Sequence, residues 1–228
     1  MDEFLIYDPI FQKYWPDDPV VGAKDLKEFL DAHKDQEVLI RFNCPGGDVF
    51  EGAAMYRCIL DHGKAHCVID GACISAATTA CMGGKSIKMA DNGLFMIHDP
   101  ATYIFGGVTD LERAVDSLKS MKTAIINSYA RSNLNKAKLD EMMTAETWMN
   151  ADDCLKANFI DEVLTHPTNQ KPSENFDFKA YRNMPTWAAD RIKSFGKKTS
   201  HNSLAVAAAK LRLAQAKNFN LSNQPVPR

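Results

Sequence analysis

Hydrophobic and polar positions follow two different periods along the first two thirds of the chain. Short runs rich in β-branched and other apolar residues predict strands at residues 4–7, 37–43, 66–70, 86–90 and 93–98. Helical periods predict helices at residues 23–33 and 48–61, and a short apolar helix at residues 75–84 that ends in two glycines. Strands that alternate with helices are typical of an α/β fold built from crossover units.

A longer helical pattern, at residues 109–131, predicts the longest helix of the chain. Thr109 and Glu112 have the spacing of a capping box. Apolar residues then recur on one face of the helix, at Leu111, Val115, Leu118, Ile125 and Tyr129. A helix at residues 151–157 and a strand at residues 158–164 follow. Periodicity alone does not separate a doubly wound sheet from another stack of crossover units.

The composition changes after the last predicted strand. Residues 167–228 hold eleven Lys and Arg against three Asp and Glu, a net charge of +8; the whole chain carries −2, so the remainder carries −10. We predict a polar linker at residues 166–202 and a basic, alanine-rich helix at residues 203–220. Trp187 and Phe195 are candidate anchors for this tail. A packed or solvated helix is the plain interpretation, and docking to another protein or loose contact with nucleic acid are alternatives.

Size and composition set limits on the class of protein. The 228 residues are 45% hydrophobic and 25% charged, which suffices for one sizeable core with an appendage. No apolar run reaches the roughly 18 residues that span a bilayer, and the first residues, MDEFLIYDP, are acidic where a signal peptide is basic. We therefore expect a soluble, cytoplasmic protein without membrane contact. The six cysteines form no CxxC pair, so reduced core thiols are expected rather than disulfides or a metal site.

Candidate chemistry begins at GACISAA (71–77), which places Ser75 between a predicted strand and a predicted helix. The free N–H groups and positive dipole end of a first helical turn suit a developing oxyanion. The same position is that of an ordinary N-cap, the commoner role of a lone serine. His98 ends the apolar run GLFMIH and lies two residues before Pro100, so its imidazole is expected at a strand end. A hydrogen-bonded core histidine is the alternative.

A third segment, RFNCPGGDVFEGAAMYRCIL (41–60), predicts a strand, a Pro-Gly-Gly turn and an amphipathic helix. Asp48 is the expected N-cap of that helix, with Glu51 three residues later. Adjacent glycines let main-chain N–H groups approach a ligand closely, because no Cβ intervenes. Alone the segment predicts a tight turn, but together with Ser75 and His98 it predicts a hydrolase site.

The segments NCPGGDVFEG, GACIS and MIHDP resemble the NSPGG, GxAxS and MIHxP segments of the ClpP family of serine peptidases, in the same order. The variant most similar to this chain is the ClpP-like protease of phages and prophages that acts in head maturation. The resemblance covers about residues 4–164, roughly 70% of the chain. It implies an α/β peptidase domain at residues 1–165, folded as a ClpP/crotonase-like superhelix of repeated ββα units with a long handle helix.

The resemblance also implies a Ser-His-acid triad without a metal or cofactor. Ser75 would be the nucleophile and His98 the general base. The acid position, counted back from the last predicted strand, falls on Glu146, where many family members carry Asp. Asp152 and Asp153 are the alternatives, although both suit the first turn of the helix that follows them.

Function and partners follow from the same resemblance. The main-chain N–H groups of Gly47 and Ala76 would hold the oxyanion of a serine endopeptidase that processes phage capsid or scaffold proteins. The alternatives are a catalytically weak or silent prohead assembly component and a crotonase-type acyl-CoA enzyme, which needs no serine and histidine at these positions. By the resemblance, residues 103–108 and the long helix correspond to the handle that interlocks two rings. A homo-oligomer built from heptameric rings is therefore expected.

Two classes of partner are not expected. The chain begins almost directly at its first predicted strand and lacks the stretch that forms the axial loops of bacterial ClpP, so docking to an unfoldase ATPase is not expected. It also has no GxxxxGK[ST] phosphate loop. Its scattered Lys and Arg include few aromatic neighbours, so nucleic acid is not an expected partner either.

Overall fold

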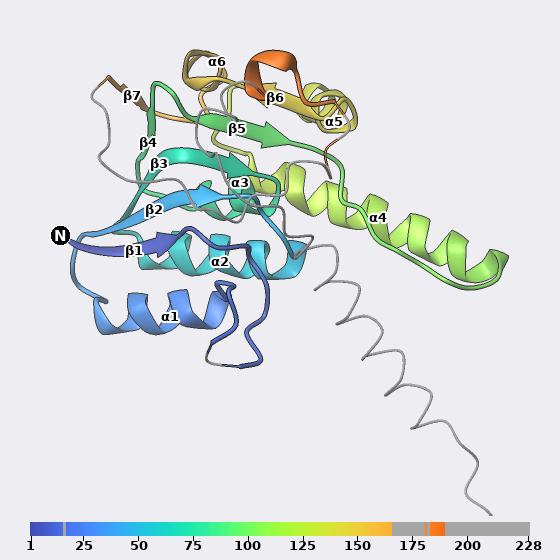
Figure 1. The fold of residues 1–228 in the computed structure, drawn as a ribbon, viewed down its shortest axis with the longest axis horizontal. Coiled ribbons are helices and arrows are strands. Elements are labelled where there is room, and N and C mark those ends of the chain that lie inside the picture. Colours follow the sequence, from blue (N-terminus) through green and yellow to red (C-terminus); the bar gives the residue numbers. More distant parts are fainter. Residues whose placement is uncertain (16, 166–180, 182, 190–228) are drawn as a thin grey trace, which may run out of the picture. The chain divides into compact units, whose positions relative to one another are not determined.

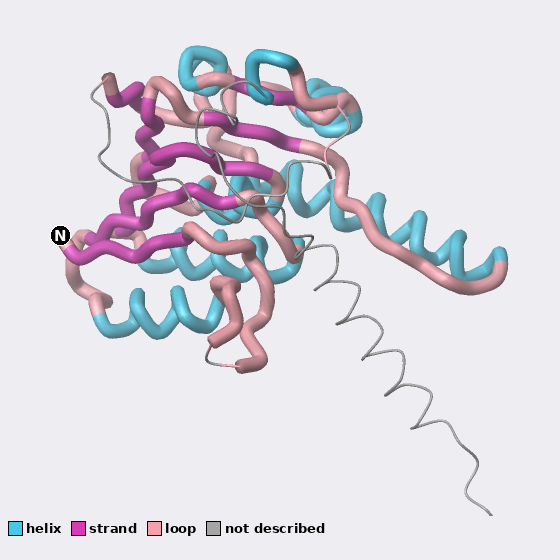
Figure 2. The backbone as a smooth tube through the Cα atoms, viewed as in Figure 1, coloured by secondary structure: helices cyan, strands magenta, loops and turns pink. Residues whose placement is uncertain are grey.

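In the computed structural model, the strands form one sheet that is parallel except at one edge (Figures 1 and 2). The structure describes residues 1–15, 17–165, 181 and 183–189. The strands are β1 (Asp2–Ile6), β2 (Val38–Cys44), β3 (Ala65–Ile74), β4 (Ile87–Ala90), β5 (Leu94–Ile97), β6 (Thr147–Met149) and β7 (Glu162–Leu164). Their order is β1-β2-β3-β4-β7, with β5 paired to β3 and β6 antiparallel to β5.

The helices pack mainly against one face of this sheet. They are α1 (Ala23–Ala32), α2 (Val49–His62), α3 (Ala76–Cys81), α4 (Val108–Ser128), α5 (Lys136–Thr144) and α6 (Ala151–Lys156). Figure 1 shows α1 and α2 side by side along the sheet and α4 extending beyond the ends of the strands. The predicted α/β class is therefore confirmed. No helix within the described residues is both long enough and apolar enough to cross a bilayer.

The long strand β3 is shared between two neighbours on the same side. Its first half pairs with β4, from Cys67 opposite Ile87 onwards. Its second half pairs with β5, ending with Ile74 opposite Met96. The predicted strand at residues 66–70 is thus too short, because β3 continues to the residue before the candidate serine. This extension brings the end of β3 beside the end of β5.

A register shift between β2 and β3 is supported by a buried amide. The pairing changes between Phe42 and Cys44. There the side-chain Oδ1 of Asn43 accepts a hydrogen bond from the main-chain N–H of Ala72 at 3.1 Å. A Cβ at Gly71 would lie only 2.7 Å from the same oxygen, so this position needs glycine. The amide thereby replaces a ladder bond where β3 leaves its regular register.

The two faces of the sheet carry different apolar clusters around the second half of β3. Cys73, Phe95 and Ile97 belong to the main core that the helices cover. Alternating with them along the strands, on the opposite face, are the members of a second cluster: Ala72, Ile74, Leu94, Met96 and Trp148, joined by Ala188. Tyr181 and Met184 pack against this second cluster. A segment from beyond the predicted peptidase domain therefore covers part of the second face.

This segment falls within the stretch predicted as a polar linker, residues 166–202. Figure 1 shows its described part in orange beside β6. Ala188 is fully buried, whereas the candidate anchor Trp187 is 39% exposed. The other anchor, Phe195, and the helix predicted at residues 203–220 lie outside the described residues, so the domain boundaries stay a prediction.

Helix starts show where capping was predicted correctly and where it was not. Asp48 caps α2 as expected, because its carboxylate accepts from the N–H groups of Phe50 and Glu51 at 2.8 and 2.9 Å. The Glu51 carboxylate does not close a capping box but accepts from the N–H of Ala23 at 2.7 Å. It therefore ties α2 to the first turn of α1.

The capping box predicted at the start of α4 is wrong. The helix begins at Val108 with Gly107 as N-cap, and the Asp110 carboxylate accepts from the Gly107 N–H at 3.0 Å. Thr109 and Glu112 lie inside the helix, because a nearer carboxylate already reaches the cap. The residues of the predicted apolar face also differ in burial along the helix. Leu111 and Val115, in the first half, are about half exposed, whereas Ile125 and Tyr129, near its end, are buried. Only the second half of α4 packs on the body.

Candidate active site

Ser75 occupies a sharp turn between β3 and α3. Its φ and ψ are 57° and −126°, a conformation that costs a non-glycine residue energy. The Ser75 N–H donates to the carbonyl of Met96 at 2.9 Å, which extends the pairing with β5. Ser75 is the N-cap residue of α3, as the plain interpretation predicted, but its side chain makes no capping hydrogen bond, so capping does not account for the hydroxyl. Such a strand-to-helix turn is the geometry that presents a nucleophile.

His98 lies directly beyond β5, next to Ser75. Its Nε2 and the Ser75 Oγ are 2.7 Å apart, a hydrogen-bond distance. Burial lowers the pKa of His98, while the negative charges of Glu146 and Asp99 oppose this shift. The imidazole is therefore held toward its neutral form, which can accept a proton from the serine hydroxyl.

Glu146 immediately precedes β6. Because Ile97 and Thr147 are register partners in the antiparallel pair, Glu146 and His98 are the next positions along the two strands. Glu146 has a φ of 52°, so its backbone also lies in the left-handed region. Its Oε1 accepts from Trp148 Nε1 at 3.3 Å, and its charge acts on the imidazole. The strand pairing thus places Glu146 beside His98, near enough for its charge to raise the pKa of the imidazole.

The alternative acids have different surroundings. Asp153 is the N3 residue of α6 and forms a capping box with Asn150, whose side chain accepts from the Asp153 N–H at 2.9 Å. Asp152 lies exposed in the first turn of the same helix. Both carboxylates therefore lie at the start of α6, as the helix-dipole interpretation predicted. The structure brings neither of them together with His98.

The Pro-Gly-Gly turn packs directly against the nucleophile turn. Gly46 has a φ of 87°, and a Cβ there would lie 2.4 Å from the carbonyl oxygen of Ile74 and 2.7 Å from Ser75 Cβ. The same position is 3.0 Å from the main-chain nitrogen of Ala76. Gly47, with a φ of 150°, pairs with Ile10, whose carbonyl a Cβ would approach to 2.0 Å. Both glycines are therefore required by space as well as by backbone conformation.

The cysteines nearest the site are structural. Cys44 Sγ donates to the carbonyl of Asp8 at 3.2 Å and accepts from the N–H of Gly46 at 3.3 Å. Burial raises the pKa of Cys44 to about 12 and also raises that of Cys73. These thiols stay protonated at neutral pH, so they are poor nucleophiles. All six cysteines are free in the structure, and five of them are buried.

Two residues near the site were missed by the sequence reasoning. The Tyr181 hydroxyl donates to the carbonyl of Pro45 at 2.7 Å, and its ring contacts those of His98 and Trp148 edge-on. The main-chain N–H of Asn183 donates to Glu146 Oε1 at 2.9 Å. Single residues in a polar stretch have no periodicity, so the sequence carried no signal for their position.

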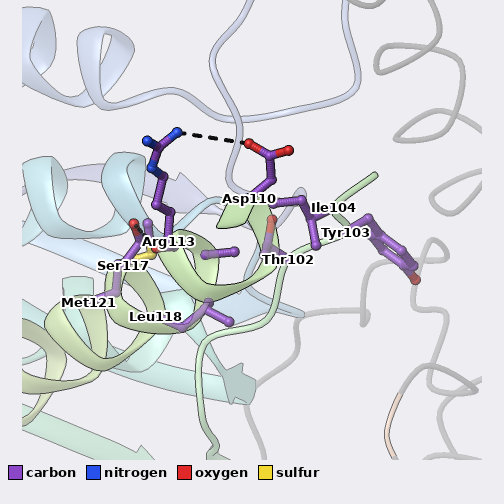
Figure 3. Close-up of a pocket in the computed structure, with 9 residues that line it drawn as sticks. Thr102, Tyr103, Ile104, Asp110, Arg113, Ser117, Leu118 and Met121 are labelled. Atoms are coloured by element: carbon purple, nitrogen blue, oxygen red, sulfur yellow. Dashed lines mark hydrogen bonds and ion pairs between the residues drawn. The ribbon is translucent and has the colours of Figure 1, made fainter. Parts of the chain in front are cut away.

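A separate hollow lies between α4 and the chain that precedes it. Its volume is about 370 Å³. Figure 3 shows the residues that line it, with Arg113 and Asp110 reaching toward one another. The lining residues are Thr102, Tyr103, Ile104, Asp110, Arg113, Ala114, Ser117, Leu118 and Met121. Since none of them is a predicted catalytic residue, this hollow is distinct from the Ser75–His98 site.

Comparison with known proteins agrees with the geometry. Residues 26–167 match the protein family described as Clp protease. The chain is 29% identical over 146 residues to the "ATP-dependent Clp protease proteolytic subunit" of Deinococcus radiodurans, covering 61% of this chain and 71% of the relative. Proteins of the same name from Carsonella ruddii and Streptococcus thermophilus are 28% and 26% identical, over 60% of this chain and 72% and 74% of their own. The matched region runs from within α1 to beyond β7.

Proposed function

Since the matched region spans more than half of the sequence, the chain belongs to the Clp protease family, and we propose that it is a serine endopeptidase whose catalytic triad is Ser75, His98 and Glu146. The observation that carries this proposal is the 2.7 Å distance between Ser75 Oγ and His98 Nε2, at a strained turn where Ser75 is partly buried. The Glu146 charge beside the imidazole supports the acid assignment, and its longer side chain does the work of the Asp common in the family.

The roles follow from the positions of the three side chains. As Ser75 Oγ attacks a peptide carbonyl, His98 Nε2 takes the hydroxyl proton and then returns it to the leaving amine. Glu146 stabilises the imidazolium that forms between these steps. Water then attacks the acyl-enzyme, with His98 again taking and returning the proton, and the second product leaves as Ser75 is restored.

We assign the oxyanion to the main-chain N–H groups of Gly47 and Ala76. The close approach of the Pro-Gly-Gly turn to Ser75 and to the start of α3 supports this assignment. The loss of one donor of this kind costs roughly 3 kcal/mol of barrier. The turn is therefore part of the proposed chemistry as well as a connection.

A fluorophosphonate probe tests the triad without knowledge of the substrate. We expect the probe to label the wild-type protein at Ser75, to leave Ser75→Ala unlabelled, and to label His98→Ala much more slowly. Intact mass after labelling measures the stoichiometry. Equal labelling of all three proteins would contradict the assignment.

We further propose that the substrates are capsid or scaffold proteins in phage head maturation, which places the reaction in the cytoplasm of a bacterial host. Similarity of the three motifs to the phage and prophage variant of the family supports this proposal. The test is co-expression with a capsid or scaffold protein encoded beside this chain, followed by measurement of the intact mass of that protein. It should be cleaved in the presence of the wild type and left whole in the presence of Ser75→Ala. Unchanged masses in both cultures would favour a silent assembly component instead.

Proteins of this family form ring-shaped homo-oligomers, and we propose a heptameric ring for this chain. The first half of α4 and the residues before it supply exposed apolar side chains that suit a contact between protomers, namely Tyr103, Ile104, Phe105, Val108, Leu111 and Val115. The hollow in Figure 3 lies within this surface. A cyclic assembly would enclose the serines and limit access to flexible segments of substrate.

A further inference from the structure

The segment that contains Tyr181 and Asn183 contacts three parts of the proposed catalytic site: the Pro-Gly-Gly turn, the base and the acid. The Tyr181 hydroxyl bonds the carbonyl of Pro45, the first residue of the Pro-Gly-Gly turn. The Tyr181 ring lies edge-on to the imidazole of His98, with centroids 5.9 Å apart. The Asn183 N–H donates to the Glu146 carboxylate. The turn, the base and the acid therefore share one neighbour.

The anchoring of this segment explains how it can hold these groups in place. Ala188 is fully buried in the cluster on the second face of the sheet, and Met184 packs against the same cluster. Trp148 contacts Tyr181 edge-on, at 5.6 Å between centroids, and donates from its Nε1 to Glu146. Asn183 adds a second bond, from its Nδ2 to the carbonyl of Ala145 at 3.1 Å. Apolar contacts thus fix the segment while polar contacts reach the site.

We infer that Tyr181 is a positioning residue for catalysis: its hydroxyl holds the Pro-Gly-Gly turn against Ser75, and its ring shields His98 from water. The inference rests on the proposed triad. The hydroxyl and the ring of Tyr181 make separate contacts, so their effects on the site can be measured separately. Loss of the hydroxyl should disturb only the turn, whereas loss of the ring should also change the environment of the base.

The groups that face His98 determine the expected pH effect. Glu146, before β6, and Asp99, after β5, both raise its pKa, and Lys122 of α4 pairs with Asp99 at 2.9 Å. Burial lowers the pKa, and this effect is the largest. Removal of the Tyr181 ring would hydrate the imidazole and raise its pKa toward the ordinary value. Because the base must be neutral, the acid limb of the pH–rate profile should then move to higher pH.

The experiment measures the second-order rate of fluorophosphonate labelling against pH, using the full chain. For Tyr181→Phe we expect a rate about fivefold lower, as for the loss of one neutral hydrogen bond, with the acid limb unchanged. For Tyr181→Ala we expect a larger loss and an acid limb raised by roughly half a pH unit. Met184→Ala is the matched control, since it removes packing from the same segment without touching His98. It should lower the unfolding temperature but leave the acid limb in place.

The outcomes separate this inference from the proposed function. If Ser75→Ala is still labelled, the triad and the role of Tyr181 both fail. If Ser75→Ala is silent but both Tyr181 variants react as the wild type does, the inference alone fails. Faster labelling of Tyr181→Ala than of the wild type would mean that Tyr181 covers and inhibits the site. An equal shift of the acid limb in Met184→Ala would mean that packing of the whole segment, and not the Tyr181 ring, sets the pKa of His98. Either result overturns the positioning role.

Discussion

At the scale of single residues, the backbone distinguishes the proposed catalytic groups. Within the described part of the chain, positive φ values at non-glycine residues occur at Ser75, Glu146 and Asn158. Asparagine tolerates this region, but serine and glutamate rarely adopt it. Two of the three positions are therefore proposed members of the triad, where strain is commonly kept because it orients a functional side chain.

Replacement of Glu146 by glutamine gives a pH prediction with a defined sign. The Glu146 charge raises the pKa of His98 against the lowering effect of burial. Without that charge the pKa falls further, so the imidazole stays neutral to lower pH and the acid limb of labelling by the probe moves down. The maximum rate should fall by a factor on the order of 10³ to 10⁴, because the imidazolium loses its partner.

Asp99→Asn is the matched control for Glu146→Gln, because Asp99 also raises the pKa of His98. Its charge is already shared with Lys122, so the acid limb should move down less. The maximum rate should change little, since this carboxylate has no assigned role in the reaction. An acid limb that moves to higher pH in Glu146→Gln would contradict the proposed arrangement.

The sequence pointed to these proposed catalytic residues but not to their conformations. Ser75 stood out between a predicted strand and a predicted helix, His98 stood out at the end of an apolar run, and the order of the motifs related them. The carboxylate was located only by counting along a resemblance. Contacts from Tyr181 and Asn183 were out of reach, because they depend on tertiary approaches between residues 136 and 37 positions apart in the sequence.

At the scale of elements, the alternation of strands and helices was readable because apolar runs and helical periods are local. Errors occurred where tertiary contacts decide an element's extent. The second half of β3 contains a glycine and small residues, yet pairing with β5 and the amide of Asn43 keep it a strand. The strand predicted at residues 158–164 is reduced to β7, because Asp161 instead accepts from the N–H of Ile87 at 2.7 Å.

Two glycines in comparable conformations test the turn that precedes α2. Gly46 has a φ of 87° and no room for a Cβ, whereas Gly63 has a φ of 68° and open space around it. Gly63→Ala should lower the free energy of unfolding by about 1 kcal/mol, the cost of the conformation alone, and leave probe labelling unchanged. Gly46→Ala should destabilise more and slow labelling on the order of 100-fold, because the turn must shift away from Ser75.

Denaturant unfolding and labelling rates measure the two effects separately. Each alanine variant should retain a cooperative unfolding transition. Similar labelling rates for Gly46→Ala and Gly63→Ala would mean that the turn does not take part in the reaction, and the oxyanion assignment to Gly47 would then lose its support.

At the scale of the whole molecule, α4 is the feature that a single chain does not explain. Its first half extends beyond the sheet with apolar side chains exposed, while its second half is anchored through Ile125 and Ile126. Tyr129, at the end of the helix, hydrogen-bonds Thr78, and Thr78 bonds the carbonyl of Ser75 at 2.6 Å. A contact made by α4 is thus connected to the nucleophile turn.

The double variant Leu111→Glu, Val115→Glu tests the ring. Charges on this surface should prevent association, so light scattering should report a smaller mass than that of the wild type, with unchanged helix content by circular dichroism. The single variant Leu155→Glu, which alters a leucine on α6 of similar exposure, should keep the wild-type mass. An unchanged mass in the double variant would rule out this surface as the contact between protomers.

The register of β3 against β5 also determines whether Ser75 and His98 lie together. Ile74 and Met96 are register partners, and Ser75 and His98 follow them by one and two residues. A slip of one residue between these strands would turn one side chain to the opposite face of the sheet. A copy that folds out of register therefore has a serine without a base. Correct register between β3 and β5 is thus a condition for the proposed nucleophile and base to meet, so a copy with slipped strands should fail to react with the probe.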